Sequence, residues 1–222
     1  MNKPDMIELI GDFLAEQKYN HNKTKEDRKE LYNAILDVYE KDWGFQDVKH
    51  MLDPDNQRDY DYLQCFKRSK YFDEFLVSPA SRSYHGAREG GLFDHSVAVF
   101  KAALELSDTI CPGHTSAAAC LLHDICKVGL YKFNPTTKKY DYNNDHIAAP
   151  HGSESLRRIL HLDDNVCRLE CELPEAWEVA IIYHMGAFMK DEAQTYGNAC
   201  EKHPEVLLLH TADMLASKVW GF

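Results

Sequence analysis

The sequence predicts an all-α protein, a helical bundle with an N-terminal helical extension packed on it. Apolar residues recur at helical spacing along most of the 222 residues. Prolines and glycines stand where helices would begin and end. Hydrophobic residues make up 44% of the chain, which is enough for the core of one fairly large domain. We therefore expect almost no β-strand.

The first part of the chain is predicted to form the extension. We assign residues 1–70 to it and residues 71–222 to the main domain. The polar residues 51–62 are expected to form a loop. The helices expected before and after this loop cover residues 5–17, 25–42 and 62–75.

The main domain is predicted to begin with a turn-rich loop at residues 78–91. Further on, Gly129 is suited to end a helix, because glycine adopts the left-handed conformation of a helix C-terminus at little cost. Residues 130–150 alternate aromatic and polar residues around a Pro-Thr-Thr turn. They are expected to form a small hairpin or an ordered loop.

Three residues are predicted to start the later helices. Ser153 is a candidate N-cap, and Pro174 and Pro204 suit the first helical position, where a missing N–H costs nothing. The helices expected in the main domain cover residues 92–107, 114–128, 152–162, 174–186 and 204–220.

Charge and cysteine content exclude several classes of function. A net charge of −11 argues against an extended basic groove for long nucleic acid. No apolar run is long enough to cross a bilayer, and the N-terminus lacks the pattern of a signal peptide. Seven cysteines without regular spacing fit free thiols in a reducing compartment. We expect a cytoplasmic protein without a membrane partner.

Histidines and aspartates on apolar helix faces predict a metal site. Five of them lie 28, 28, 33 and 29 residues apart, about the length of two antiparallel helices with their connections, so they can return to one level of a bundle. A buried carboxylate must be paired, hydrogen-bonded or bound to a metal. Taken singly, each histidine is more often a hydrogen-bonded core residue than a ligand, but five such residues on consecutive helices favour metal binding. The candidate ligands are His95, His123, His151, His184 and Asp213, with Asp124 beside His123.

The motifs that carry these residues resemble the HD-domain metal-dependent phosphohydrolase superfamily, in particular its compact bacterial and phage members, from about residue 72 to residue 219. These motifs are "GGLFDHS", "LLHDICK", "HGSES", "YHMG" and "HTADMLAS". The resemblance implies one metal ion held by His95, His123, Asp124 and Asp213. It implies a second held by His151 and His184, with Asp124 bridging the two. One or two divalent ions (Mn, Fe, Ni, Co or Zn) suit these ligands.

The resemblance also suggests how a substrate phosphate is handled. Two such ions would activate a water molecule for attack on phosphorus. Asp124 and Lys127 would be catalytic, and the family's H-D-x-x-K pattern implies that Lys127 pairs with the phosphate. Lys127 could instead complement a helix dipole. Arg82, His85 and Arg88 are candidates to bind phosphate or, for His85, to donate a proton, and are equally plausible as solvated loop residues.

Aromatic residues in the stretch 130–150 leave two interpretations open. They could form a wall against which a base stacks, or they could pack beneath a loop, which we consider the better expectation. These residues are Tyr131, Phe133, Tyr140 and Tyr142.

The function expected from these observations is hydrolysis of a phosphoester of a nucleotide or short oligonucleotide. The H-H-E and G-Y-P signatures of HD enzymes for cyclic dinucleotides are absent, since "YHMGAF" stands where the first would be. A mixed-valence di-iron oxygenase acting on a small molecule would use the same ligands. A nucleotide-sensing module without activity would be expected to lack a ligand, and none is missing.

Overall fold

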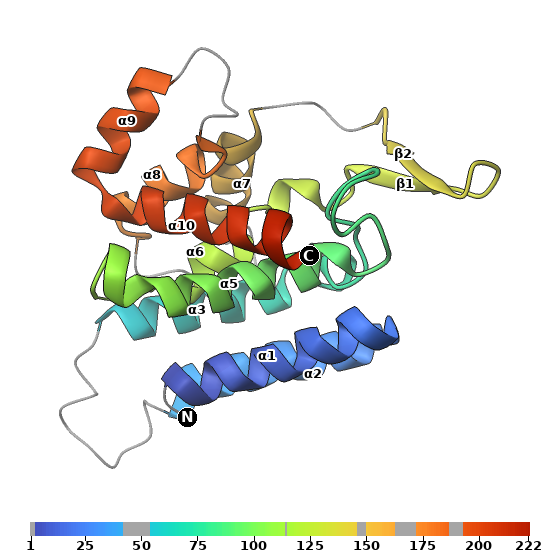
Figure 1. The fold of residues 1–222 in the computed structure, drawn as a ribbon, viewed down its shortest axis with the longest axis horizontal. Helices are drawn as coiled ribbons and strands as arrows, with labels where there is room; N and C mark the ends of the chain where they lie inside the picture. Colours follow the sequence, from blue (N-terminus) through green and yellow to red (C-terminus); the bar gives the residue numbers. More distant parts are fainter. Residues whose placement is uncertain (1–2, 42–53, 114, 146–149, 163–171, 187–192) are drawn as a thin grey trace.

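Figure 1 shows the protein in a computed structural model, in which the all-α prediction is confirmed. Residue 42 of one expected helix and residues 51–53 of the expected loop lie outside the described part of the chain. The structure describes residues 3–41, 54–113, 115–145, 150–162, 172–186 and 193–222.

Helices make up nearly all of the regular structure. The α-helices are α1 Lys3–Asn20, α2 Lys25–Lys41, α3 Pro54–Arg68, α4 Phe72–Phe75, α5 Gly91–Ile110, α6 Ala117–Leu122, α7 His151–Leu160, α8 Glu175–Tyr183, α9 Ala193–Lys202 and α10 Pro204–Met214. Two shorter turns of other helical types are the 3₁₀ turn η1 Ile125–Lys127 and the π-helical turn η3 Leu215–Trp220.

A two-stranded hairpin interrupts the helices between η1 and α7. Strands β1 Tyr131–Asn134 and β2 Lys139–Tyr142 are antiparallel, with Tyr131 opposite Tyr142 and Phe133 opposite Tyr140. The hairpin was one of the two forms expected for this stretch. It projects from the helical body beside the loop that precedes α5 (Figure 1).

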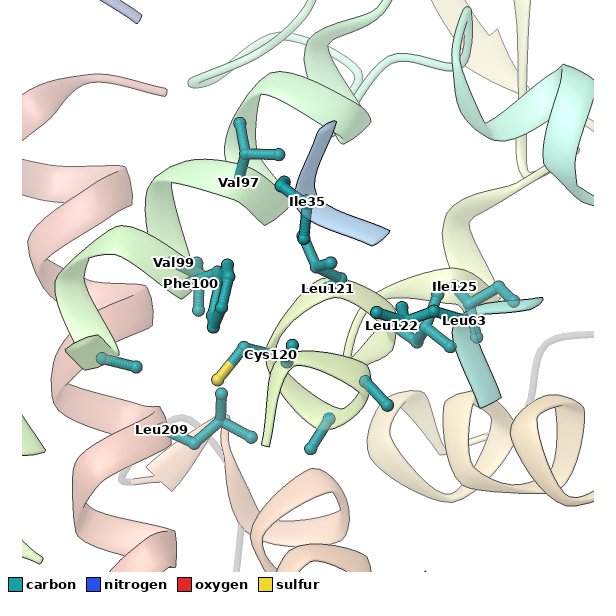
Figure 2. Packing of buried hydrophobic residues seen from close by; sticks show 14 of the residues in the cluster. Ile35, Leu63, Val97, Val99, Phe100, Cys120, Leu121, Leu122, Ile125 and Leu209 are labelled. Atoms are coloured by element: carbon teal, nitrogen blue, oxygen red, sulfur yellow. The ribbon is translucent and has the colours of Figure 1, made fainter. Parts of the chain in front are cut away.

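Helix α6 lies at the centre of the core, and all six of its residues are buried. Figure 2 shows side chains from α2, α3, α5 and α10 packed around it, among them Ile35, Leu63, Phe100 and Leu209. Small residues in α6 allow these helices to approach closely. His123 directly follows α6, so the well-packed core fixes the position of its backbone.

The N-terminal helices are joined to α5 by a buried ionic cluster. Arg28 in α2 is only 2% exposed, and its Nε lies 2.9 Å from Oδ1 of Asp94, which is fully buried. Gln17 in α1 and Arg88 also donate hydrogen bonds to Asp94. Asp94 directly precedes the candidate ligand His95, so the extension holds the start of the helix that carries it.

The sequence predicted one continuous helix over residues 114–128, but the described part of this segment is broken into two shorter turns of helix. Helix α6 ends at Leu122, and Asp124 leaves the helical conformation with φ −109° and ψ 15° before η1 begins. Gly129, with φ +77°, then turns the chain, as expected of a helix terminator. The break points both residues of the His-Asp doublet into the same space, which a continuous helix would not do.

The loop predicted for residues 51–62 is also wrong over its described part, because α3 begins at Pro54. This segment is too polar to show an apolar face. One of its polar residues is nevertheless buried: Asp59 accepts hydrogen bonds from the hydroxyl of Ser116 and from the backbone N–H groups of Ala117 and Ala118. Asp59 thus caps α6 from a distant part of the sequence.

Two helix starts and one helix also differ from the expectation, whereas α10 begins at Pro204 as expected. Helix α7 begins at His151, so Ser153 lies inside it, and Pro174 precedes α8 as its N-cap residue. Gly152 lies against the backbone of α8, and a Cβ there would be 2.4 Å from the carbonyl oxygen of Ile181. The N-cap residue of α7 is Pro150, which makes no side-chain capping hydrogen bond. Helix α9 was not predicted, because its sequence is largely polar.

Candidate metal centre

All six candidate ligands meet at one place in the bundle. Three of the histidine rings form a continuous row, with centroids 5.4 Å apart for His95 and His123 and 5.0 Å apart for His123 and His184. The ligands are His95 in α5, His123 and Asp124 after α6, His151 at the start of α7, His184 after α8 and Asp213 near the end of α10.

The carboxylate of Asp124 lies between two sets of histidines. Its Oδ2 is 3.6 Å from Nε2 of His95 and 3.5 Å from Nε2 of His123. Its Oδ1 is in contact with Nε2 of His151 and lies 3.5 Å from Nε2 of His184. Each oxygen of one carboxylate therefore belongs to a separate group of nitrogen atoms.

Two ligand groups follow from these distances. In the α5 group, His95, His123 and Asp124, the possible ligand atoms all lie within 4.8 Å of one another, and the same holds for the α7 group, Asp124, His151 and His184. Asp213 adjoins the α5 group, with Oδ1 3.2 Å from Nε2 of His95. The two groups share Asp124 and no other residue.

Backbone carbonyls orient three of the histidines as metal ligands. Nδ1 of His123 lies 2.8 Å from the carbonyl oxygen of Cys120, and Nδ1 of His184 lies 2.6 Å from that of Ile181. Nδ1 of His95 is 3.2 Å from the backbone oxygen of Phe222. With Nδ1–H donating to a carbonyl, each Nε2 presents a lone pair to the site.

These Nε2 atoms test whether the site fits a metal ion. The Nε2 atoms of His95, His123 and His184 are buried, and none has a hydrogen-bond partner among the described residues. Buried polar atoms without a partner are rare and destabilising, whereas a metal ion would satisfy all three. The residues present therefore fit one or two divalent cations.

Burial and neighbouring charges set the protonation of two of the candidate ligands. Burial lowers the pKa of His123 to about 3, which keeps the imidazole neutral and able to bind metal. Burial alone would raise the pKa of Asp124. The positive charge of Lys127 and the hydrogen bond with His151 outweigh burial and hold the pKa of this carboxyl well below its usual range, so it is ionised.

Lys127 lies beside the shared carboxylate. Its Nζ is 2.5 Å from Oδ2 of Asp124, and its side chain is only 13% exposed. Burial opposes its charge, but the carboxylate outweighs burial and raises the pKa of Lys127. The helix whose dipole it could have complemented ends at Leu122, five residues earlier. Lys127 is therefore a fixed cation at the edge of the ligand cluster.

The three residues predicted in the loop before α5 lie in different places. The ring of His85 is next to that of His95, with centroids 5.3 Å apart, and burial together with His95 lowers the pKa of His85 to about 4. The guanidinium of Arg82 lies 5.4 Å from the ring centre of Tyr142 in the hairpin. Arg88 is 3.0 Å from Asp94 and helps to neutralise that buried carboxylate.

Sequence reasoning missed Cys126. Its Sγ lies 3.1 Å from Nδ1 and 3.9 Å from Nε2 of His151. Burial raises the pKa of the Cys126 thiol to about 12, so it is a neutral partner for this ring. Its place two residues after the His-Asp doublet was no signal, because a buried cysteine next to a helix end is ordinary.

Comparison with known proteins agrees with this geometry. Residues 92–218, more than half of the chain, match the family model of the HD domain, and this stretch contains all six candidate ligands. No curated protein and no solved structure matches the chain. Among the described helices, none combines the length and the apolar character that a bilayer crossing requires.

Proposed function

Because this chain belongs to the HD-domain family, we propose that it is a phosphohydrolase that cleaves a phosphoester of a nucleotide or short oligonucleotide at a two-metal site. One observation carries this proposal: the two oxygens of Asp124 face two different groups of histidine nitrogens. A shared carboxylate is the usual bridge in two-metal hydrolytic sites. If only one ion were bound, one of the two ligand groups would hold no metal.

Under this proposal, residues of the chain bind and orient the substrate around the metals. When bound, the two divalent ions supply an activated water and neutralise the charge that develops on the phosphate. Lys127 would pair with a phosphate oxygen from the edge of the cluster, because its ammonium is fixed 2.5 Å from Asp124. His85, neutral near pH 7, would donate a hydrogen bond to the leaving oxygen.

A screen of phosphomonoesters and phosphodiesters of nucleotides with added Mn²⁺ or Fe²⁺ tests this function. We expect turnover of at least one nucleotide-derived ester that disappears on chelation and returns with the metal. Bound iron with O₂ uptake, and no phosphoester turnover, would favour the oxygenase that shares these ligands. A metal-free protein that binds nucleotides without turnover would favour the sensing module.

Two metal ions per chain are expected in the purified protein, because the site holds two ligand groups. Elemental analysis should find about two ions per chain. His151→Ala should leave about one, because it removes a ligand of the α7 group alone. His161→Ala is the matched control, since His161 is an exposed histidine at the far end of the same helix, and it should keep both. One ion in the unaltered protein would contradict the two-metal proposal.

Replacing Lys127 with methionine should separate substrate binding from metal binding. Methionine keeps the apolar stem, so the fold and both ions should survive. The lost contact is charge-assisted, and its removal should lower kcat/KM by roughly ten- to a hundredfold, or ~1.5–3 kcal/mol. Steady-state kinetics and elemental analysis of the same sample measure both. Unchanged turnover with a lowered melting temperature would make Lys127 a structural residue.

A further inference from the structure

The hairpin β1–β2 presents an aromatic surface on one of its faces. Residues directly opposite each other in an antiparallel pair point to the same side, and so do residues two apart along a strand. Tyr131 opposite Tyr142 and Phe133 opposite Tyr140 therefore share one face. Their ring centres are 5.4 Å and 5.5 Å apart within the two pairs. These four residues are called the aromatic face below.

Two rings of the aromatic face are open to solvent, which corrects for them the expectation that these rings pack beneath a loop, and the rings of Tyr131 and Tyr140 are half-buried. Phe133 and Tyr142 are each 57% exposed. The hairpin extends away from the helical body, so its rings contribute little to the core (Figure 1). Exposed aromatic residues gathered on one side of a short hairpin are a binding surface more often than a packing surface.

The inner end of the aromatic face adjoins the candidate metal centre. Tyr131 follows Lys127 by four residues, and the charges of Lys127 and Asp124 act on its phenol, whose pKa is raised mainly by burial. Hydrogen bonds hold the segment between Lys127 and Tyr131 in place. Asn143 donates hydrogen bonds to the carbonyl oxygens of Leu130 and Gly129, both 2.9 Å long. The inner ring pair is therefore held at a fixed position, four residues along the chain from the lysine beside the candidate ligands.

Cations accompany the aromatic face, although the whole chain carries a net charge of −11. Arg82 is exposed and lies over the ring of Tyr142, at 5.4 Å. Lys138 and Lys139 are exposed at the outer end of the hairpin, and Lys127 lies at the inner end. Flat rings with cations beside the inner ring pair and at the outer end are complementary to stacked bases on a phosphate backbone.

We propose that the aromatic face binds a single-stranded oligonucleotide of at least two nucleotides, with its reacting phosphoester at the metal centre. The proposal rests on the phosphohydrolase function and gives it a substrate class. The two ring pairs are two residues apart along the strands, roughly 6–7 Å, so each can hold one base of adjacent nucleotides. Tyr131 and Tyr142 would receive the base nearer the metals, and Phe133 and Tyr140 the next one.

Binding of two labelled strands to the metal-loaded protein tests this proposal. One is a fluorescein-labelled three-residue oligothymidylate with phosphorothioate links, which resist cleavage. The other is an abasic strand with the same links and charge. Fluorescence anisotropy should show that the protein binds the thymidylate about tenfold to a hundredfold more tightly, because only this strand has bases to stack.

The double variant Phe133→Ala/Tyr142→Ala should lose most of that preference while binding the abasic strand as before. Both side chains are exposed, so its melting temperature should stay close to that of the unaltered protein. Tyr142→Phe, which keeps the ring, should retain the preference. Tyr19→Ala is the matched control, because Tyr19 is 82% exposed on α1, away from the hairpin, and it should change nothing.

The possible outcomes distinguish failure of this binding proposal from failure of the phosphohydrolase function. Equal affinity of the unaltered protein for the two strands, or an unchanged preference in the double variant, would overturn the proposal and leave the aromatic face to a protein partner. A preference that depends on the rings, in a protein without phosphoester turnover, would uphold the binding surface and overturn the hydrolase function. Phosphoester turnover by a protein that shows no preference for the strand with bases would uphold the hydrolase function and overturn the binding surface.

Discussion

Asp124→Ala should abolish phosphoester hydrolysis and remove both metal ions. The side chain is almost fully buried, and its two oxygens are the only atoms that the two ligand groups share in the described part of the chain. Without it, each group retains only neutral imidazoles, apart from Asp213 beside His95. Each group then has one ligand fewer and no shared carboxylate, so its affinity for a divalent ion should fall.

Thermal melts with and without metal give a second measurement of the same change. In the unaltered protein, a metal present at 100 times its Kd should add about 2.7 kcal/mol to the free energy of unfolding. This gain should vanish in Asp124→Ala. The variant also leaves Lys127 buried without its partner carboxylate, so its melting temperature in the absence of metal should fall as well.

Two further variants keep this prediction open to contradiction. Asp124→Asn has nearly the same volume and should fold, yet it should bind no more than one ion because the amide has a single carbonyl oxygen. Asp108→Ala, at an exposed aspartate on α5, should leave metal content and activity unchanged. Full metal content and turnover in Asp124→Asn would show that the carboxylate is structural.

Arg28→Ala should lower the free energy of unfolding by about 3–5 kcal/mol, the usual cost of removing one partner of a buried ion pair. Arg28 is 2% exposed and Asp94 is fully buried. The variant would leave Asp94 with Gln17 and the partly exposed Arg88 as hydrogen-bond donors. Chemical denaturation followed by circular dichroism measures the change.

A second, exposed ion pair on the same helix serves as a control that separates the effect of burial from the effect of charge. Lys25 also lies in α2 and forms an ion pair, but its partner Asp73 is 75% exposed, so Lys25→Ala should cost only about 0–1 kcal/mol. Because Asp94 precedes His95, Arg28→Ala should also weaken metal binding, whereas Lys25→Ala should not. Equal small effects of both variants would mean that residues 1–70 fold as a unit that is independent of the site.

The sequence by itself determined the helical class of the fold and selected the set of candidate ligands. Helical periodicity depends on residues three and four apart, which the sequence displays directly. The same periodicity showed histidines and aspartates on faces that must be buried, and a buried carboxylate requires a partner. The six ligands that these arguments selected are the six that meet in the structure.

Only the tertiary structure decided what depends on contacts between distant residues. Asp59 caps α6 from 57 residues away, and Arg28 reaches Asp94 across 66 residues. Polar residues with such roles are indistinguishable in the sequence from solvated ones, so the first part of α3 was taken for a loop. The break after Leu122, which turns Asp124 toward both ligand groups, likewise follows from packing around α6. The exposure of the hairpin rings was decided in the same way, because a sequence shows which residues are aromatic and not what covers them.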